Sequence, residues 1–74
     1  MEIVLAERLK QCRKAKGLTQ KEVAIHCDIT EKAYQNYERM TREPKLEILL
    51  KIADMFDVSL DYLVGRTDMK RVLK

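Results

Sequence analysis

Few side chains in this 74-residue sequence are of types that could do covalent or metal chemistry. It contains one histidine, His26, and two cysteines, Cys12 and Cys27. Adjacent residues on a helix point about 100° apart, so His26 and Cys27 seldom bind one metal ion. There is no nucleophile beside a general base and no glycine-rich phosphate loop. We therefore expect that the protein is not an enzyme and that it binds no cofactor, metal or small-molecule ligand. The cysteines fit buried thiols, and a disulfide or a metal site is the alternative.

A different chemistry is open to four polar side chains on one side of a predicted helix, residues 30–39. Lysine can donate to guanine in the DNA major groove, asparagine or glutamine can pair with adenine, and glutamate can accept from cytosine. An ordinary solvated helix face is the alternative interpretation. The four are Glu31, Lys32, Gln35 and Asn36, and we expect Ala33, Tyr34 and Tyr37 to anchor the opposite side.

Helix start and stop signals surround this face. A first helix is predicted over residues 3–16 and ends at Gly17, with Leu5, Leu9 and Cys12 as its buried stripe. Thr19 and Glu22 form a capping box for a second helix that ends near residues 27–28. Thr30 then caps the third helix. Such a short connection forces the two axes to cross steeply, which predicts a helix-turn-helix unit.

Two further helices complete the predicted all-α, five-helix domain. We expect the fourth over residues 44–57, with Pro44 in its first turn, and it is too apolar to be buried on one side only. Ser59 caps a short fifth helix over residues 60–64, which Gly65 ends. Residues 1–65 are therefore expected to form the domain. Residues 66–74 form a short basic tail, either a helical turn or a frayed end.

Composition agrees with a DNA-binding class. Hydrophobic residues make up 46% of the chain and charged residues 36%, which fits a globular protein. Residues 8–45 carry ten basic and five acidic side chains, whereas residues 46–65 carry one and four, so one face suits a polyanion. No apolar run reaches the ~20 residues of a membrane span. The start of the chain does not resemble a signal peptide. We expect a cytoplasmic protein without a membrane partner.

Several blocks, in order, resemble the Cro/phage-repressor-like (XRE-type) helix-turn-helix family. They are residues 17–24, Tyr37 with Glu38, residues 44–54 and residues 58–65. The resemblance spans residues 5–65 and implies a lambda-repressor-like domain with the helix-turn-helix in helices two and three. It further implies a sequence-specific regulator of transcription that binds double-stranded DNA. The expected regulator is a repressor that binds a palindromic operator as a homodimer through the major groove.

The resemblance also implies roles for single residues. Gln20 is expected to contact a phosphate and to brace the third helix, and Ala24 to be the small residue where helices two and three touch. Arg13 and Glu38 match a family ion pair. The base-contacting set is again Glu31, Lys32, Gln35 and Asn36. The phosphate-contacting set is Gln20, Thr30, Arg39, Thr41, Arg42 and Lys45. The alternative for the cations of this set is that they are surface charges that contact no phosphate. The sequence departs from the family at Asp28 and Met40, where glycine is usual, and at Tyr34, where an aliphatic residue is usual.

Apolar residues in the fourth and fifth helices exceed what a single buried stripe needs. They are candidates for a dimer interface, and filling of the monomer core is the alternative. The candidates are Ile48, Ile52, Met55, Tyr62, Leu63 and Val64, with Val72 and Leu73 of the tail. Two other functions stay open: an interaction module that binds a protein such as a toxin or an antirepressor, and a nonspecific nucleic-acid binder.

Overall fold

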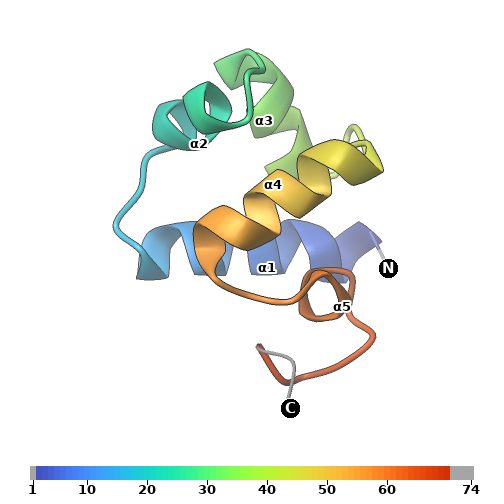
Figure 1. Ribbon diagram of the computed structural model, residues 1–74. Coiled ribbons are helices and arrows are strands. Elements are labelled where there is room, and N and C mark those ends of the chain that lie inside the picture. Colours follow the sequence, from blue (N-terminus) through green and yellow to red (C-terminus); the bar gives the residue numbers. More distant parts are fainter. Residues whose placement is uncertain (1, 71–74) are drawn as a thin grey trace.

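The computed structural model describes residues 2–70, and for residues 2 and 3 it describes the backbone only (Figure 1). The described chain is all helical, which confirms the predicted fold class. The five helices are α1 (Glu2–Ala15), α2 (Gln20–His26), α3 (Glu31–Glu38), α4 (Leu46–Phe56) and α5 (Leu60–Leu63). Helix α3 contacts both α1 and α2, and α5 contacts α1 and α4. None of these helices combines the length and the apolar character that crossing a membrane requires.

Three helices begin where local hydrogen bonding predicts. The hydroxyl groups of Thr19, Thr30 and Ser59 each accept a backbone N–H three residues later, and Glu22 completes the capping box of α2. Helix α4 differs, because the predicted first-turn position of Pro44 is wrong. Lys45 is the extended N-cap residue and its side chain makes no capping bond, so the helical backbone begins only at Leu46. Pro44 is buried ahead of the helix.

Left-handed residues end several helices, and two of them lack the expected glycine. Asp28, with φ of 57°, follows α2, and Met40, with φ of 64°, follows α3. In both turns the next residue donates its N–H to a carbonyl five positions back: Ile29 to Ala24, and Thr41 to Asn36. This pattern is a Schellman motif, and glycine is common at its left-handed position because it has no Cβ. Aspartate tolerates this conformation better than methionine does.

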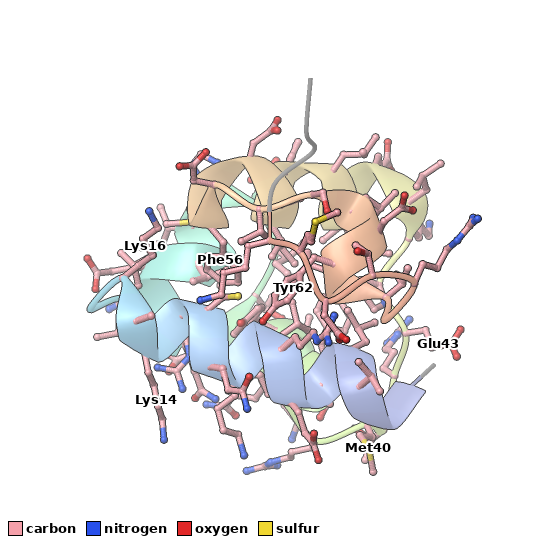
Figure 2. The ribbon with its side chains drawn as sticks, turned by 90° about the horizontal axis from the view of Figure 1, so that it is seen from below. Lys14, Lys16, Met40, Glu43, Phe56 and Tyr62 are labelled. Carbon is pink, nitrogen blue, oxygen red and sulfur yellow. The ribbon has the colours of Figure 1, made fainter. Side chains whose placement is uncertain are left out.

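The core is built from the faces that helical periodicity predicts. Leu5, Leu9 and Cys12 of α1 are buried. They belong to one cluster with residues of every other helix, which are Val23, Ala24, Tyr34, Tyr37, Ile52, Phe56 and Leu63 among others. Figure 2 shows Phe56 and Tyr62 among the side chains between α1 and α4. Both cysteines are buried free thiols, and burial raises the pKa of each.

The predicted role in a dimer interface is wrong for three residues, because the core of their own chain encloses them. Ile52 and Leu63 have no exposed surface, and Tyr62 is 8% exposed. The alternative, that such residues fill the monomer core, holds for these three. Ile48, Met55 and Val64 are partly exposed and stay candidates. Val72 and Leu73 lie outside the described residues.

Residues 66–70 lie against the domain and are held by Arg8 of α1. Its guanidinium donates to the backbone oxygen of Thr67 at 2.6 Å and to the carboxylate of Asp68 at 2.8 Å. The same group donates to the backbone oxygen of Tyr62 and lies 4.0 Å from the centre of that ring. The contacts attach this segment to α1 and α5. Whether residues 66–74 form a separate tail stays a prediction.

Candidate nucleic-acid interface

Helices α2 and α3 form the predicted crossed pair rather than one continuous helix. Helix α2 ends at His26 and α3 begins at Glu31, so four residues lie between them. The turn between them contains the left-handed Asp28, and the N–H of Ile29 returns to the carbonyl of Ala24. Ala24 itself is 2% exposed. A larger side chain at this position would overpack the core around it.

The four polar residues of α3 lie outside the core, and we call them the polar face of α3. Glu31 and Lys32 are exposed, and Gln35 and Asn36 are partly exposed. The opposite side is buried and contains Tyr34, Tyr37 and Glu38. The rings of Tyr34 and Tyr37 meet edge to face, with centroids 6.2 Å apart. Arg39 is exposed and lies one turn beyond Gln35, at the end of the polar face. The helix therefore has an anchored side and a free polar side, as a groove-binding helix requires.

A buried ion pair fixes α3 to the two preceding helices. Arg13 of α1 donates to both carboxylate oxygens of Glu38, with Nε–Oε2 at 2.7 Å and Nη2–Oε1 at 3.2 Å. Gln20 of α2 donates to the same carboxylate at 3.2 Å, and Arg13 also binds the backbone oxygen of Leu18. The ion pair and the bracing contact implied by the family resemblance are both present. A phosphate contact by Gln20 stays a prediction.

Two pKa shifts follow from this arrangement. Burial is the largest single influence and raises the pKa of the Glu38 carboxyl, but the hydrogen bonds from Arg13 and Gln20, the Tyr34 hydroxyl and the charge of Arg13 together outweigh it, and the pKa lies below its ordinary value. The bond to Glu38 raises the pKa of the Arg13 guanidinium. Tyr34 is fully buried beside this pair, and its hydroxyl lies close to the Glu38 carboxylate without making a hydrogen bond of ordinary geometry within residues 2–70. Burial and the Glu38 carboxylate raise the pKa of Tyr34 far above its ordinary value.

The remaining predicted phosphate contacts surround the polar face and are exposed. Thr30 and Thr41 already make backbone hydrogen bonds at the two ends of α3, to the N–H of Ala33 and to the carbonyl of Asn36. Within residues 2–70, the cations of this set have no carboxylate partner: Arg39, Arg42 and Lys45. The same part of the chain contains no group of three residues that could hold a metal ion.

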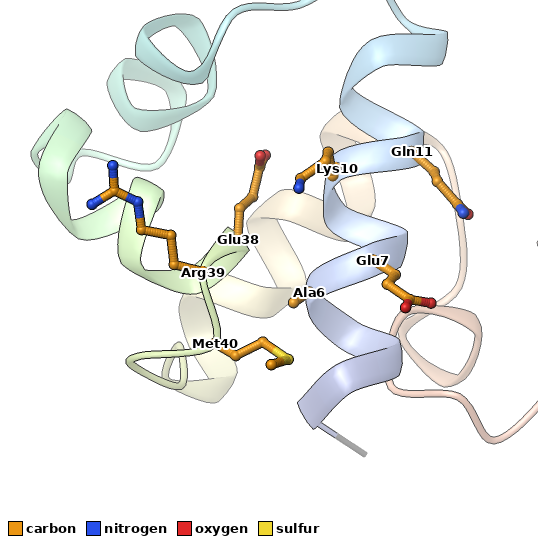
Figure 3. Close-up of a pocket in the computed structure, with 7 residues that line it drawn as sticks. All are labelled: Ala6, Glu7, Lys10, Gln11, Glu38, Arg39 and Met40. Atoms are coloured by element: carbon orange, nitrogen blue, oxygen red, sulfur yellow. The ribbon is translucent and has the colours of Figure 1, made fainter.

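The sequence did not predict a groove that lies between α1 and the end of α3 (Figure 3). It has a volume of about 350 Å³. Its walls come from segments almost thirty residues apart: Ala6, Glu7, Lys10 and Gln11 on one side, and Glu38, Arg39 and Met40 on the other. The Arg13–Glu38 pairing was the one sequence signal that these two segments lie together. Lys10, three residues before Arg13, could have been placed from it.

The short connection, the crossed helices and the exposed polar face define a helix-turn-helix DNA-binding domain. A family model described as "Helix-turn-helix" matches residues 9–63, most of the chain. This chain therefore belongs to the XRE-type helix-turn-helix family.

Similar proteins support the assignment of this chain to the helix-turn-helix family. The chain is 42% identical over 71 residues to YqaE, an HTH-type transcriptional regulator of Bacillus subtilis, covering 96% of this chain and 61% of that protein. It is 40% identical over 62 residues to the phage CTXphi repressor RstR of Vibrio cholerae, covering 84% and 55%. Both relatives are named as regulators of transcription. The chain spans 53–61% of the length of YqaE, RstR and the Bacillus subtilis regulator ImmR.

The fold matches those of solved protein structures. The DNA-binding domain of the P22 C2 repressor superimposes with a TM-score of 0.81 at 25% identity, covering 99% of this chain and 95% of that one. The restriction-modification controller protein C.AhdI of Aeromonas hydrophila gives 0.76 at 30% identity, covering 82% and 92%. These matches confirm the predicted lambda-repressor-like domain.

Proposed function

We propose that this chain is the DNA-binding part of a cytoplasmic transcriptional regulator. In this proposal the polar face of α3 enters the major groove of double-stranded DNA and contacts base edges. The observation that carries the proposal is the outward polar face on a helix whose other side is anchored by Glu38, Tyr34 and Tyr37. A major groove about 12 Å wide admits one helix. The names of YqaE and RstR support a regulator of this kind.

Repression at a palindromic operator by a homodimer is the more specific part of the proposal. One domain covers one half-site, and two half-sites lie about 34 Å apart in the helix-turn-helix arrangement. The name of RstR, a phage repressor, favours repression over activation. Ile48, Met55 and Val64 supply the partly exposed apolar surface for a second copy. Binding to a toxin or an antirepressor is a separate possibility, which co-purification would reveal.

Selection of bound sequences from a random duplex library tests this function. We expect enrichment of an inverted repeat. Lys32→Ala and Asn36→Ala should each weaken the free energy of binding to the selected duplex by ~1–3 kcal/mol. Arg42→Ala should weaken binding to all sequences alike and reduce the salt dependence. Lys70→Ala is the matched control, because Lys70 is exposed and its carbonyl binds the N–H of Ser59, away from α3.

Two outcomes would contradict the proposal. Equal affinity of the wild-type chain for selected and random duplexes would show a nonspecific binder. A single protomer on selected DNA, measured by sedimentation at high protein concentration, would exclude the homodimer.

A further inference from the structure

Residues 66–70 turn back along α5, and we call them the strap (Figure 1). The turn begins at Gly65, which has a φ of 85°, and a Cβ at this position would lie 2.9 Å from Cγ1 of Val4 in α1. Glycine is suited to both conditions because it has no Cβ. The strap then reaches the other end of α5, where the carbonyl of Lys70 accepts the N–H of Ser59 at 2.6 Å. It therefore runs beside α5 from the last turn of the helix to its N-cap.

The strap is held mainly by hydrogen bonds. Its residues are exposed except for Thr67, which is partly buried, so the strap removes little apolar surface from water. Arg8 of α1 supplies two of the bonds, to the backbone oxygen of Thr67 and to the carboxylate of Asp68. Segments that bury little apolar surface open at a lower free energy than the rest of a fold. We therefore expect the strap to open more readily than the core.

Helix α5 depends on its contacts with this strap. It has four residues, and an isolated helix of that length is not stable. The strap binds the N–H of Ser59 at the N-cap, and Arg8 binds the carbonyl of Tyr62 together with that of Thr67. Val64, directly after α5, is one of the three partly exposed candidates for the dimer interface. The docked strap therefore fixes the position of a residue that the proposed homodimer uses.

We propose that the strap is a releasable element, held by Arg8, whose docking orders α5 and the dimer surface beside it. Release leaves α3 in place, because the Arg13–Glu38 pair joins α3 to α1 and involves no residue of the strap. The connection to the homodimer rests on the proposed function, whereas the release of the strap does not. A regulator built in this way changes its self-association without changing the side chains that contact bases.

Amide hydrogen exchange of the full chain, measured by NMR, tests the release. In wild type, the N–H of Ser59 should exchange at least about tenfold faster than that of Tyr34 in α3, after correction for intrinsic rates, because only the strap must open. If Ser59 exchanges as slowly as Tyr34, the proposal is overturned, since the strap would then open only with the whole fold. This comparison needs no substitution.

The Arg8→Gln variant tests which residue holds the strap. It removes both hydrogen bonds from Arg8 to the strap, and bonds to a charged group typically contribute enough to change an equilibrium constant about tenfold. Exchange at Ser59 should therefore rise by about that factor. Arg66→Gln is the matched control with the same charge change, because Arg66 lies in the strap with 77% of its side chain exposed, and it should alter the rate by less than about twofold. A wild-type rate in Arg8→Gln would overturn the assignment to Arg8.

Addition of the selected duplex tests the connection to the dimer surface. If the homodimer requires the docked strap, binding of two protomers should slow exchange at Ser59 by about tenfold or more. An unchanged rate would overturn this connection. A selection that enriches no sequence would instead contradict the proposed function, and exchange in the free chain would still decide whether the strap opens by itself.

Discussion

Replacing Glu38 by glutamine tests whether the buried ion pair holds the polar face in place. The substitution keeps the size of the side chain and removes its charge. Arg13 is left without a countercharge, and its side chain is only 13% exposed. Of its hydrogen bonds, the one to the backbone oxygen of Leu18 survives, and the amide oxygen of glutamine can accept one more.

The loss is expected at the lower end of the range for a broken buried pair. Removing one partner typically costs ~3–5 kcal/mol, and the surviving bonds of Arg13 place this case at about 3 kcal/mol. A chain of this length has a total stability of roughly 4–11 kcal/mol. The melting temperature should therefore fall by roughly 12–24 °C. Binding to a selected duplex should weaken as well, because Glu38 joins α3 to α1 and α2.

The effect has a defined dependence on pH. The folded pKa of Glu38 lies below its ordinary value of 4.5, so the ionised carboxylate stabilises the fold above that pH. This stabilisation is lost as the pH falls through the folded pKa. The Glu38→Gln variant has no such group. The difference in stability between the two proteins should therefore be largest near neutral pH and should narrow below pH 4.5.

Thermal unfolding followed by circular dichroism at pH 7 and in a series down to pH 3 measures both effects. Glu7→Gln is the control, because Glu7 is exposed and its substitution should change stability by no more than ~0.5 kcal/mol. A Glu38→Gln variant that melts within about 4 °C of wild type at pH 7 would refute the reasoning, since that shift is worth less than about 1 kcal/mol. A difference that stays constant into acid would refute the assignment to the carboxylate charge.

Three smaller changes follow from the described contacts. Met40→Gly should raise stability by roughly 0.5–1 kcal/mol in urea unfolding, because glycine adopts the φ of 64° without strain; an unchanged midpoint would count against this. Thr19→Ala should cost ~1 kcal/mol, since it removes the hydroxyl that accepts the N–H of Glu22, and a loss below ~0.3 kcal/mol would show that the cap contributes little. Tyr34→Phe should leave stability unchanged or raise it by up to ~1 kcal/mol, because the lost hydroxyl has no described partner; a marked loss would reveal one.

Local chemistry explains why the helix order was predictable. A capping hydroxyl acts on an N–H three residues away, so Thr19, Thr30 and Ser59 place the starts of α2, α3 and α5 without knowledge of the rest of the chain. The polar face of α3 follows from a period of 3.6 residues in the same way. The start of α4 was misplaced at Pro44 because nothing local caps that helix. Its first turn depends on how the preceding loop is packed.

Contacts between distant residues could not be read from spacing. Arg13 and Glu38 are 25 positions apart, and only the likeness to a known family paired them. Ile52 and Leu63 are as apolar as residues in an interface, yet the core of their own chain covers them completely. An apolar side chain is driven from water in either setting, so its type alone does not distinguish a core from a dimer surface.

The sequence by itself determined the order of the helices, the caps of α2, α3 and α5 and the polar face, because each depends on residues within a few positions of one another. Tertiary structure alone decided which apolar residues remain free, how Glu38 is neutralised, and that α1 and the end of α3 enclose a groove. Those features arise where segments far apart in the chain pack together. Their geometry is set by the crossing of whole helices.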